Sequence, residues 1–397
     1  MKNIGNFKGK ETAMSKIVGI ICEYNPFHLG HKYQIDKIRE EIPDAKIVAI
    51  MSGNTVQRGE FAIIDKHKRA EIALENGVDL VLEMPFPYST STAEIFANAG
   101  VEIASKCGCD YLYFGTENCD IHYLEMLASA TNSKEFENAL KRHLQNKRQS
   151  YIVAKEKALM DMGFEKALLA NDMLGVEYIR AIRKKKAKII PCAIERVGAG
   201  YNDKSKCKIM SASAIRDSYY ENGTFMSVPK NSVYRKAVKA DSVLSRQKAY
   251  DFLHRMALII PREKFDNAFD SSPEIGALIK DSANAAKNGE EFFSKITSKS
   301  FTFARVRRIL LYAIYGITEI DKSPKFAFLL GFNLNGREIL NSMKKGKFAV
   351  VTKHSDAKWL GIESNVNLVF EVDKLYKTLL NEPESLDTVY KATPIIK

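Results

Sequence analysis

Short apolar runs alternate with amphipathic stretches through the first half of the chain. The apolar runs have the length and β-branched content of buried strands, and the stretches between them repeat apolar residues at helical spacing. The expected strands are Ile17–Cys22, Ile47–Met51, Asp79–Leu82, Tyr111–Phe114 and Lys188–Ile194. The expected helices include Lys32–Glu41, Asp65–Asn76 and Ala93–Lys106. Because strands joined through helices are connected by right-handed crossovers, the pattern predicts an α/β fold with a parallel sheet and helices on both faces. Ligands of such sheets bind at the carboxyl ends of the strands, where the connection order reverses.

The pattern changes after an expected helix at Ser211–Glu221. The following segment is dominated by helical periodicity, with little strand in between. The helices expected there are Tyr234–Leu253, Glu291–Ile296, Phe303–Tyr315 and Arg337–Lys344. A boundary is expected within Asn222–Asn231, where turn-forming residues gather. The sequence thus predicts a loose arm at residues 1–13, an α/β domain at 14–225 and a mostly helical C-terminal domain at 226–397.

Composition excludes a disordered, fibrous or membrane-spanning chain. Hydrophobic residues make up 45% and charged residues 27% of the 397 positions, close to the globular averages of about 45–50% and about 25%. The chain has no apolar run of about 18 residues, and residues 1–16 lack the apolar core of a secretory signal. We therefore expect a cytoplasmic protein that contacts no membrane. The cysteines form no CxxC pair, which predicts reduced thiols and no metal site. They are Cys22, Cys107, Cys109, Cys119, Cys192 and Cys207.

The net charge of +12 is concentrated in two segments. Residues 151–250 hold 20 Lys and Arg against 10 Asp and Glu, and residues 301–350 hold 9 against 3. A localised basic excess is typical of proteins that bind nucleic acid, because each neutralised phosphate releases condensed counterions. A solvated basic surface is the alternative that charge alone leaves open.

The strand-to-helix turn Cys22–His31 is the first candidate site. It places His28 and His31 three residues apart at the start of an expected helix, where unpaired N–H groups and the helix dipole attract a phosphate. Gly30 leaves room for a nucleotide at the backbone, and Pro26 fixes the path of the turn. The two imidazoles can donate hydrogen bonds to an α-phosphate and stabilise the charge that develops as pyrophosphate leaves. Surface or zinc-binding histidines are the alternative for this spacing.

A second candidate site lies at Lys208–Arg216. It puts Ser211, Ser213 and Arg216 at the start of a helix that follows the last expected strand. Two hydroxyls and a guanidinium can hold the β- and γ-phosphates of a nucleotide, although a serine N-cap on an ordinary helix would look the same. The chain contains neither GxxxxGK[ST] nor GxGxxG, so no P-loop kinase or dinucleotide dehydrogenase is indicated. The two sites together favour nucleotidyl transfer.

Several collinear segments resemble a known family. The sequence GIICEYNPFHLGH is similar to the HxGH signature of the nucleotidyltransferase superfamily, and MSASAIR is similar to its ISSTxIR motif. More specifically, the chain resembles the bacterial tRNA(Met) cytidine acetate ligases. The matching segments are EYNPFHLGH (23–31), GNTVQRGEFAIIDKHKRAEIAL (53–74), GVDLVLEMPFPYSTSTAEIFA (77–97), YFGTE (113–117), ANDMLGVEYIRAI (170–182), ERVGAGYND (195–203) and SASAIR (211–216).

This resemblance implies a two-step reaction on a Rossmann-like nucleotidyltransferase domain. Acetate attacks the α-phosphate of ATP to give acetyl-adenylate and pyrophosphate, and the exocyclic amine of the wobble cytidine in elongator tRNA(Met) then takes the acetyl group. The implied cofactor is ATP with Mg²⁺ carried by the nucleotide, and no group is bound permanently. The partners are elongator tRNA(Met) and acetate, with no obligatory protein partner.

The resemblance also implies which residues bind ATP, with His28 and His31 as the catalytic pair. The implied ATP-binding residues are Ile21, Cys22, Glu23, Tyr24, Asn25, Pro26, Phe27, His28, Leu29, Gly30, His31, Gln34, Gly115, Asn171, Arg196, Ser211, Ser213 and Arg216. From the residues alone, Gly115 could simply end a strand and Asn171 could cap a helix. Arg196 could equally form a surface ion pair with Glu195 or Asp203. At position 172 the chain has Asp where the family pattern more often has Asn.

A basic helix in the C-terminal part is a candidate tRNA contact. Arg305, Arg307 and Arg308 lie on the expected helix Phe303–Tyr315, whose other face is apolar. A packed surface helix is the alternative for this pattern.

Two rival functions share part of the pattern. The first is a nucleotidyltransferase that acts on a small phosphorylated substrate, which needs neither two basic segments nor a helical domain. The second is a non-catalytic tRNA-binding protein, which would not need both phosphate motifs intact. A class I aminoacyl-tRNA synthetase also activates a carboxylate but is more distant at this length.

Overall fold

A computed structural model describes most of the chain. The described residues are 15–117, 119–145, 151–164, 169–196, 209–230, 232–296, 301–344, 346 and 348–397. Their strands are β1 (Ile17–Cys22), β2 (Lys46–Ser52), β3 (Leu80–Met84), β4 (Tyr111–Thr116), β5 (Ile190–Glu195), β6 (Phe326–Phe332), β7 (Ala349–Val351) and β8 (Ile395–Ile396). The helices up to residue 222 are α1 (Leu29–Glu41), α2 (Lys66–Glu75), η1 (Tyr88–Thr90), α3 (Ala93–Lys106), α4 (Ile121–Ala130), α5 (Lys134–Leu144), α6 (Tyr151–Met160), α7 (Ala170–Lys185) and α8 (Ala212–Asn222). The later helices are α9 (Ser232–Lys239), α10 (Arg246–Ile259), α11 (Arg262–Asp266), α12 (Pro273–Ala285), α13 (Gly289–Lys295), α14 (Phe303–Tyr315), α15 (Leu334–Met343), α16 (Asp356–Leu360), α17 (Glu363–Thr378) and α18 (Thr388–Lys391).

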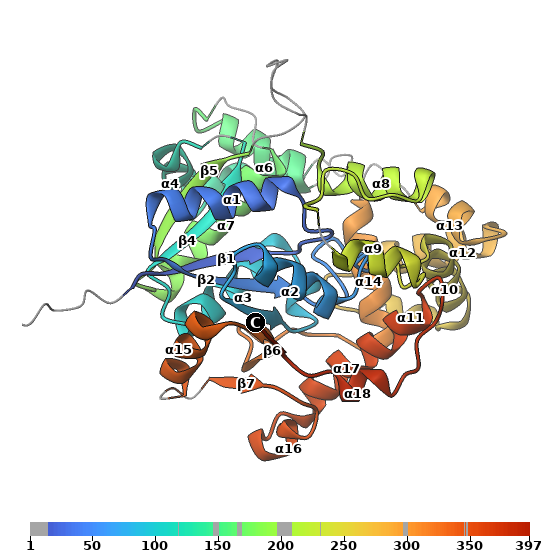
Figure 1. Cartoon of the computed structure of the whole chain (residues 1–397). Coiled ribbons are helices and arrows are strands. Elements are labelled where there is room, and N and C mark those ends of the chain that lie inside the picture. The colour runs from blue at the N-terminus through green and yellow to red at the C-terminus, as the bar shows by residue number, and fades with distance from the viewer. Residues whose placement is uncertain are drawn as a thin grey trace, which may run out of the picture.

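One mixed sheet runs through the molecule (Figure 1). Its order is β5-β4-β1-β2-β3-β6-β7, with β8 paired to β6. Strands β1 to β5 are all parallel, which confirms the predicted parallel sheet. The chain builds β2 and β3 on one side of β1 and then β4 and β5 on the other, so the connection order reverses between β1 and β4. Sheets of this kind bind ligands beside the carboxyl ends of the strands at such a reversal.

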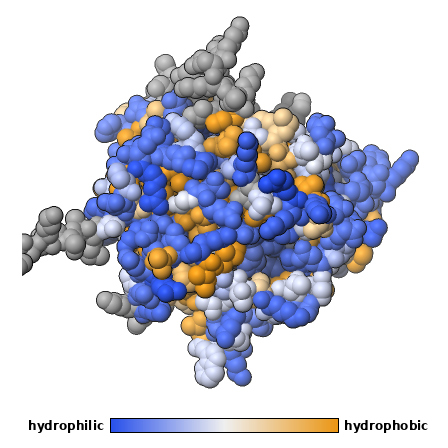
Figure 2. Space-filling view, viewed as in Figure 1, coloured by the Kyte–Doolittle hydropathy of each residue, from blue (hydrophilic) through white to orange (hydrophobic). Residues whose placement is uncertain are grey.

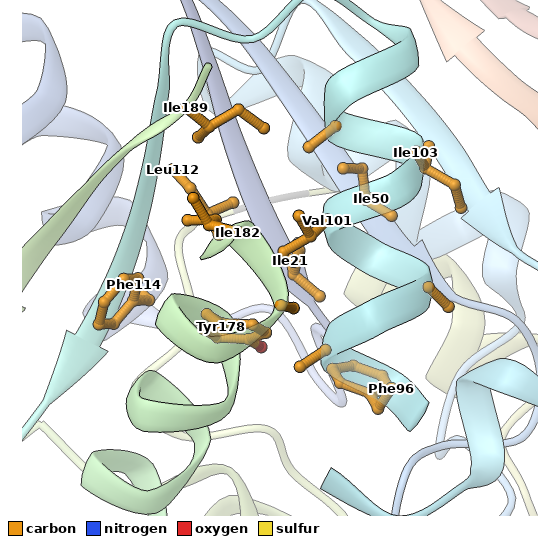
Figure 3. Close-up of a cluster of buried hydrophobic side chains, with 14 of the residues drawn as sticks. Ile21, Ile50, Phe96, Val101, Ile103, Leu112, Phe114, Tyr178, Ile182 and Ile189 are labelled. Carbon is orange, nitrogen blue, oxygen red and sulfur yellow. The ribbon is translucent and has the colours of Figure 1, made fainter. Parts of the chain in front are cut away.

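Both faces of the sheet carry apolar side chains, because helices pack against each face and bury the central strands. On one face, Val18 and Ile20 of β1 pack in a cluster with α1, α2 and α9. On the other face, Ile21 packs with α3 and α7. Figure 3 shows this second cluster, in which Val101 of α3 and Tyr178 of α7 surround Ile21. The paired helices fix β1 in place, and with it the turn that follows β1.

The C-terminal part is mostly helical, as predicted, but it also contributes strands to the sheet. Strand β6 pairs antiparallel with β3, and β7 and β8 both pair parallel with β6. The expectation of little strand after residue 226 was therefore incomplete. The run FAFLLGF of β6 is continuously apolar, and all but its last residue are buried. That run was the available signal for a buried strand.

The expected helix Tyr234–Leu253 is two helices, α9 and α10. Between them the chain is extended, and Val243 and Leu244 form single bridges to Ile64 and Leu380. Asp241 has a φ of 52°, in the left-handed region that ends a helix. Ser245 then caps α10 by accepting the Lys248 N–H. The interruption comes from tertiary pairing, which helical periodicity does not reveal.

The helices α10 to α14 pack with α17 around a separate apolar cluster. Phe61 and Phe86, from the segments that follow β2 and β3, complete this cluster. The boundary proposed between residues 225 and 226 is thus crossed by both the sheet and a core. None of the described helices is both long enough and apolar enough to span a membrane.

Candidate active site

The turn after β1 is anchored by aromatic side chains. Tyr24 has a φ of 47° and is buried, and its ring lies 4.8 Å from the ring of Phe27. A left-handed conformation at a bulky residue is costly, so the surrounding packing must hold it. Ile21 and Cys22 are also buried among apolar side chains. The side chains of these four predicted ATP-binding residues belong to the core, so a ligand at the turn could reach only their backbone.

The two histidines form a capping box at the start of α1. His28 is the N-cap, and its Nδ1 accepts the Gly30 N–H at 3.0 Å. His31 Nδ1 accepts the His28 N–H at 3.2 Å. The rings stack with centroids 3.8 Å apart. Because each Nδ1 accepts a hydrogen bond, a neutral imidazole here carries its proton on Nε2. The backbone therefore fixes two Nε2–H donors side by side.

Burial keeps both imidazoles uncharged. It lowers the pKa of His28 to about 4, with a further contribution from Arg196. It holds the pKa of His31 well below its usual value, with His28 and Arg196 adding to the effect. An anion bound at the rings would raise both pKa values, because it favours the charged form. The histidine pair thus offers neutral donors at the positive end of a helix.

Gly30 also makes room for a neighbouring side chain. A Cβ at this position would lie 2.8 Å from Cε1 of His28, closer than side-chain contacts allow. The glycine therefore makes room for the His28 ring. Gln34, one turn further along α1, donates its amide N–H to the Tyr113 carbonyl at 3.2 Å and so holds α1 over β4.

Gly115, Asn171 and Arg196 lie together at the carboxyl ends of β4 and β5. A Cβ at Gly115 would lie 3.1 Å from Cγ of Arg196. Arg196 donates its backbone N–H to Thr116 O at 3.0 Å. Glu117 joins the group, since Asn171 donates to its carboxylate and Arg196 Nε lies 3.8 Å from the same oxygen. The structure thus brings the three predicted residues to one place and adds a carboxylate that the sequence did not indicate.

The structure contradicts the alternative that Asn171 caps a helix. Leu169 is the N-cap of α7, and Asn171 lies in the first turn. Asp172 accepts the Glu117 N–H at 3.0 Å and so ties the start of α7 to the end of β4. This departure from the family pattern has a defined role, because an acid in the first turn also complements the helix dipole.

The second motif reaches the turn after β1 through Arg216. Ser211 caps α8 by accepting the Ala214 N–H at 3.2 Å, and Ser213 Oγ lies 3.3 Å from Ser211 Oγ. Arg216 donates to Asn25 O at 2.8 Å and to Glu60 Oε2 at 3.0 Å. Both predicted motifs therefore meet at one edge of the sheet, as expected. Residues 197–208, which include Asp203 and Cys207, lie outside the described residues.

Two further carboxylates line this edge. Glu23 Oε1 accepts the Gln57 N–H at 3.0 Å, and burial raises the pKa of Glu23 while Arg216 opposes that rise. Glu60 accepts from Arg216 of α8 and also from Arg307 of α14. The sequence did not indicate a role for Glu60, because its partners are distant in the chain.

The three arginines of α14 are already paired with acids. Arg307 donates to Glu60 and to Tyr250 Oη, and its guanidinium lies 3.8 Å from the Phe303 ring centroid. Arg308 lies 3.6 Å from a carboxylate oxygen of Asp270, and Arg305 donates to the Asp270 backbone carbonyl. Arg307 and Arg308 are buried. Their burial argues against the predicted contact of these two with tRNA, whereas the contact of half-buried Arg305 stays a prediction.

The cations in the segment after β2 are also engaged in structural contacts. Lys66 is buried between Glu83, at 2.7 Å, and Asp373 of α17. Arg69 is fully buried and donates to the Glu23 carbonyl at 2.6 Å. These pairs connect α2 to the strand ends and to α17. In the part of the chain that the structure describes, no group of three or more His, Cys, Asp or Glu could hold a metal ion.

Comparison with known families agrees with this geometry. Residues 15–389 match the family profile described as HIGH Nucleotidyl Transferase. The chain therefore has a HIGH nucleotidyltransferase fold, as predicted. Its parallel strands β1 to β5 carry the histidine turn where their connection order reverses.

Individual relatives identify the family more specifically. A tRNA(Met) cytidine acetate ligase of Fervidobacterium nodosum is 35% identical over 353 residues, which cover 83% of this chain and 82% of the relative. A ligase of the same name from Clostridium novyi is 34% identical over 407 residues, covering 96% and 99%. The crystal structure of Thermotoga maritima TmcAL bound with alpha-thio ATP superposes with a TM-score of 0.87 at 28% identity, covering 96% of this chain and 99% of that one. The chain belongs to the tRNA(Met) cytidine acetate ligase family.

Proposed function

We propose that this protein activates acetate with ATP and acetylates the wobble cytidine of elongator tRNA(Met). In the first step an acetate oxygen attacks the α-phosphorus, and pyrophosphate leaves. In the second step the exocyclic amine attacks the acetyl carbon, AMP leaves and the amine loses one proton. The observation that carries the proposal is the pair of Nε2–H donors fixed at the start of α1, in a chain related along nearly its whole length to ligases of this name.

The proposed ATP site lies between the two motifs. The triphosphate lies against the turn Cys22–His31 and the start of α8, where N–H groups, Ser211, Ser213 and Arg216 face a polyanion. Gly115, Asn171 and Arg196 flank the nucleotide at the next two strands. His28 and His31 donate to the α-phosphate as its charge grows, and preorganised donors are most effective in that role. Mg²⁺ enters with the nucleotide.

The tRNA substrate fits this chemistry because an anticodon loop presents unstacked bases. A cytidine turned out of the loop can reach an acyl group held at the strand ends, and proximity then accelerates the transfer. The site of action is the cytoplasm, where tRNA is modified.

Acetate-dependent exchange of labelled pyrophosphate into ATP tests the first step without tRNA. We expect exchange that needs acetate, followed by release of AMP when tRNA(Met) is added. Exchange that needs a phosphorylated small molecule in place of acetate would instead support the first rival function. The absence of any exchange from a protein that binds tRNA would support the second rival.

A further inference from the structure

Helix α9 lies directly beside the histidine turn. Its inner side chains Val233, Tyr234 and Ala237 are buried in the cluster that contains Phe27. The Tyr234 hydroxyl donates to the Phe27 carbonyl, one residue before His28. The helix is therefore held against the backbone of the proposed ATP-binding turn.

The outer face of α9 is basic. Arg235, Lys236 and Lys239 are exposed, and we call these three residues the α9 basic face. None of them forms an ion pair with a carboxylate of the described residues. The arginines of α14 differ, because Glu60 and Asp270 already neutralise them. Figure 2, viewed as in Figure 1, shows hydrophilic side chains with a few hydrophobic ones among them in the region of α9.

This arrangement suits a nucleic-acid backbone better than a membrane. The five residues from Arg235 to Lys239 advance about 6 Å along the helix axis, a length that lets the cations meet neighbouring phosphates of one strand. An interfacial membrane helix needs a free apolar face, but the apolar face of α9 is buried. Uncompensated cations next to an active site also attract a polyanionic substrate over a long range.

We propose that the α9 basic face binds the phosphate backbone of the tRNA next to the cytidine that is acetylated. This inference rests on the proposed function and gives it a docking surface. The α9 basic face replaces Arg307 and Arg308 as the tRNA contact, since those two side chains are buried. It also accounts for part of the basic excess of residues 151–250.

The test uses the full-length variant Arg235→Gln/Lys236→Gln/Lys239→Gln, with tRNA(Met) binding followed by fluorescence anisotropy over a salt series. We expect the affinity at low salt to fall about tenfold or more, with a log–log salt slope shallower by roughly 2 to 3 for three lost phosphate contacts. Acetate-dependent pyrophosphate exchange should be unchanged, because no residue of the triple variant lies in the proposed ATP site. The charge-preserving variant Arg235→Lys/Lys236→Arg/Lys239→Arg should bind tRNA as the unaltered protein does.

A matched control removes three other lysines that are exposed and not paired with a described carboxylate: Lys322, Lys344 and Lys358. The control variant should keep both the affinity and the salt slope. An equal loss of tRNA affinity in both triple variants would show that only net charge matters and would overturn the proposal. Unchanged tRNA binding by the α9 variant would also overturn it. Binding to anionic phospholipid vesicles is measured in parallel, and a loss seen only there would overturn the proposal as well. If the unaltered protein failed to acetylate tRNA at all, the proposed function itself would fail.

Discussion

The histidine pair should contribute to chemistry more than to nucleotide binding. Its Nε2–H donors are fixed by backbone hydrogen bonds, so in the proposed reaction they would meet the growing charge on the α-phosphate without reorganising. We expect His28→Ala or His31→Ala to slow acetate-dependent pyrophosphate exchange by roughly 10²–10³-fold, the loss typical of one such donor. The dissociation constant for ATP, measured by calorimetry, should change much less. His122→Ala, at an exposed position on α4, is the control. Exchange at the normal rate in both histidine variants would remove the catalytic assignment.

Burial of His28 also makes stability depend on pH. Its folded pKa of about 4 lies below the unfolded value of about 6.5, so the folded state resists protonation. The resulting stability is fully present above pH 6.5 and is lost as the pH falls towards 4. Between pH 7 and pH 5 we expect His28 to account for a loss of about 2 kcal/mol in the free energy of unfolding. Urea denaturation at both pH values should show a smaller loss for His28→Gln. An identical loss in that variant would contradict the assigned pKa.

Glu60 should strengthen ATP binding although it carries a negative charge. It holds one edge of Arg216, whose remaining N–H groups can face the triphosphate. We expect Glu60→Gln to weaken ATP binding about tenfold, within the range for a hydrogen bond to a charged group. The same change in an Arg216→Lys background should have little effect, because Glu60 acts through Arg216. Glu40→Gln, on the exposed side of α1, is the control. Tighter ATP binding would show that Glu60 only repels phosphate.

Among the elements, those with uninterrupted periodicity could be predicted from the sequence. The observed bounds of β1, α3 and α14 equal the expected ones, because turn residues or caps flank each run. The split between α9 and α10 could not be predicted, since bridges from Val243 and Leu244 to distant segments create it. In the candidate site, the histidine turn and the serine motif could be recognised from the sequence because the residues of each are close together in the chain. The role of Glu60 could not be recognised from the sequence, because its partners Arg216 and Arg307 lie 156 and 247 residues away in the chain.

Helix α14 should depend on its buried Arg307 for stability. The Arg307 side chain is 9% exposed and pairs with Glu60. Without Arg307, Glu60 keeps its pair with Arg216, so the cost should fall below the about 3–5 kcal/mol typical of a buried charge left unpaired. We expect Arg307→Ala to lower the free energy of unfolding in urea by about 2 kcal/mol, through the lost hydrogen bonds to Glu60 and Tyr250. A change below about 0.5 kcal/mol, together with a clear loss of tRNA affinity, would restore Arg307 as a surface contact.

At the scale of the whole molecule, the sheet and the cores make the two halves of the chain interdependent. Strand β6 covers the edge of β3, and its register pairs Leu80 with Phe332 and Glu83 with Phe328. Truncation after residue 230 would expose this edge together with Phe61 and Phe86. Each large apolar side chain that loses its burial costs about 1.5–3 kcal/mol. We expect the fragment 15–230 to unfold without a cooperative transition in circular dichroism. A cooperative transition with ATP binding retained would show an independent domain that ends near residue 225.

In the proposed reaction, acetate itself supplies the acetyl group that reaches tRNA. The most direct measurement incubates the full chain with ATP, isotope-labelled acetate and elongator tRNA(Met), and then locates the label by mass spectrometry of tRNA fragments. We expect labelled acetyl on the wobble cytidine, formed only when ATP is present and accompanied by AMP and pyrophosphate. Unlabelled tRNA from a preparation that binds both ATP and tRNA would contradict it.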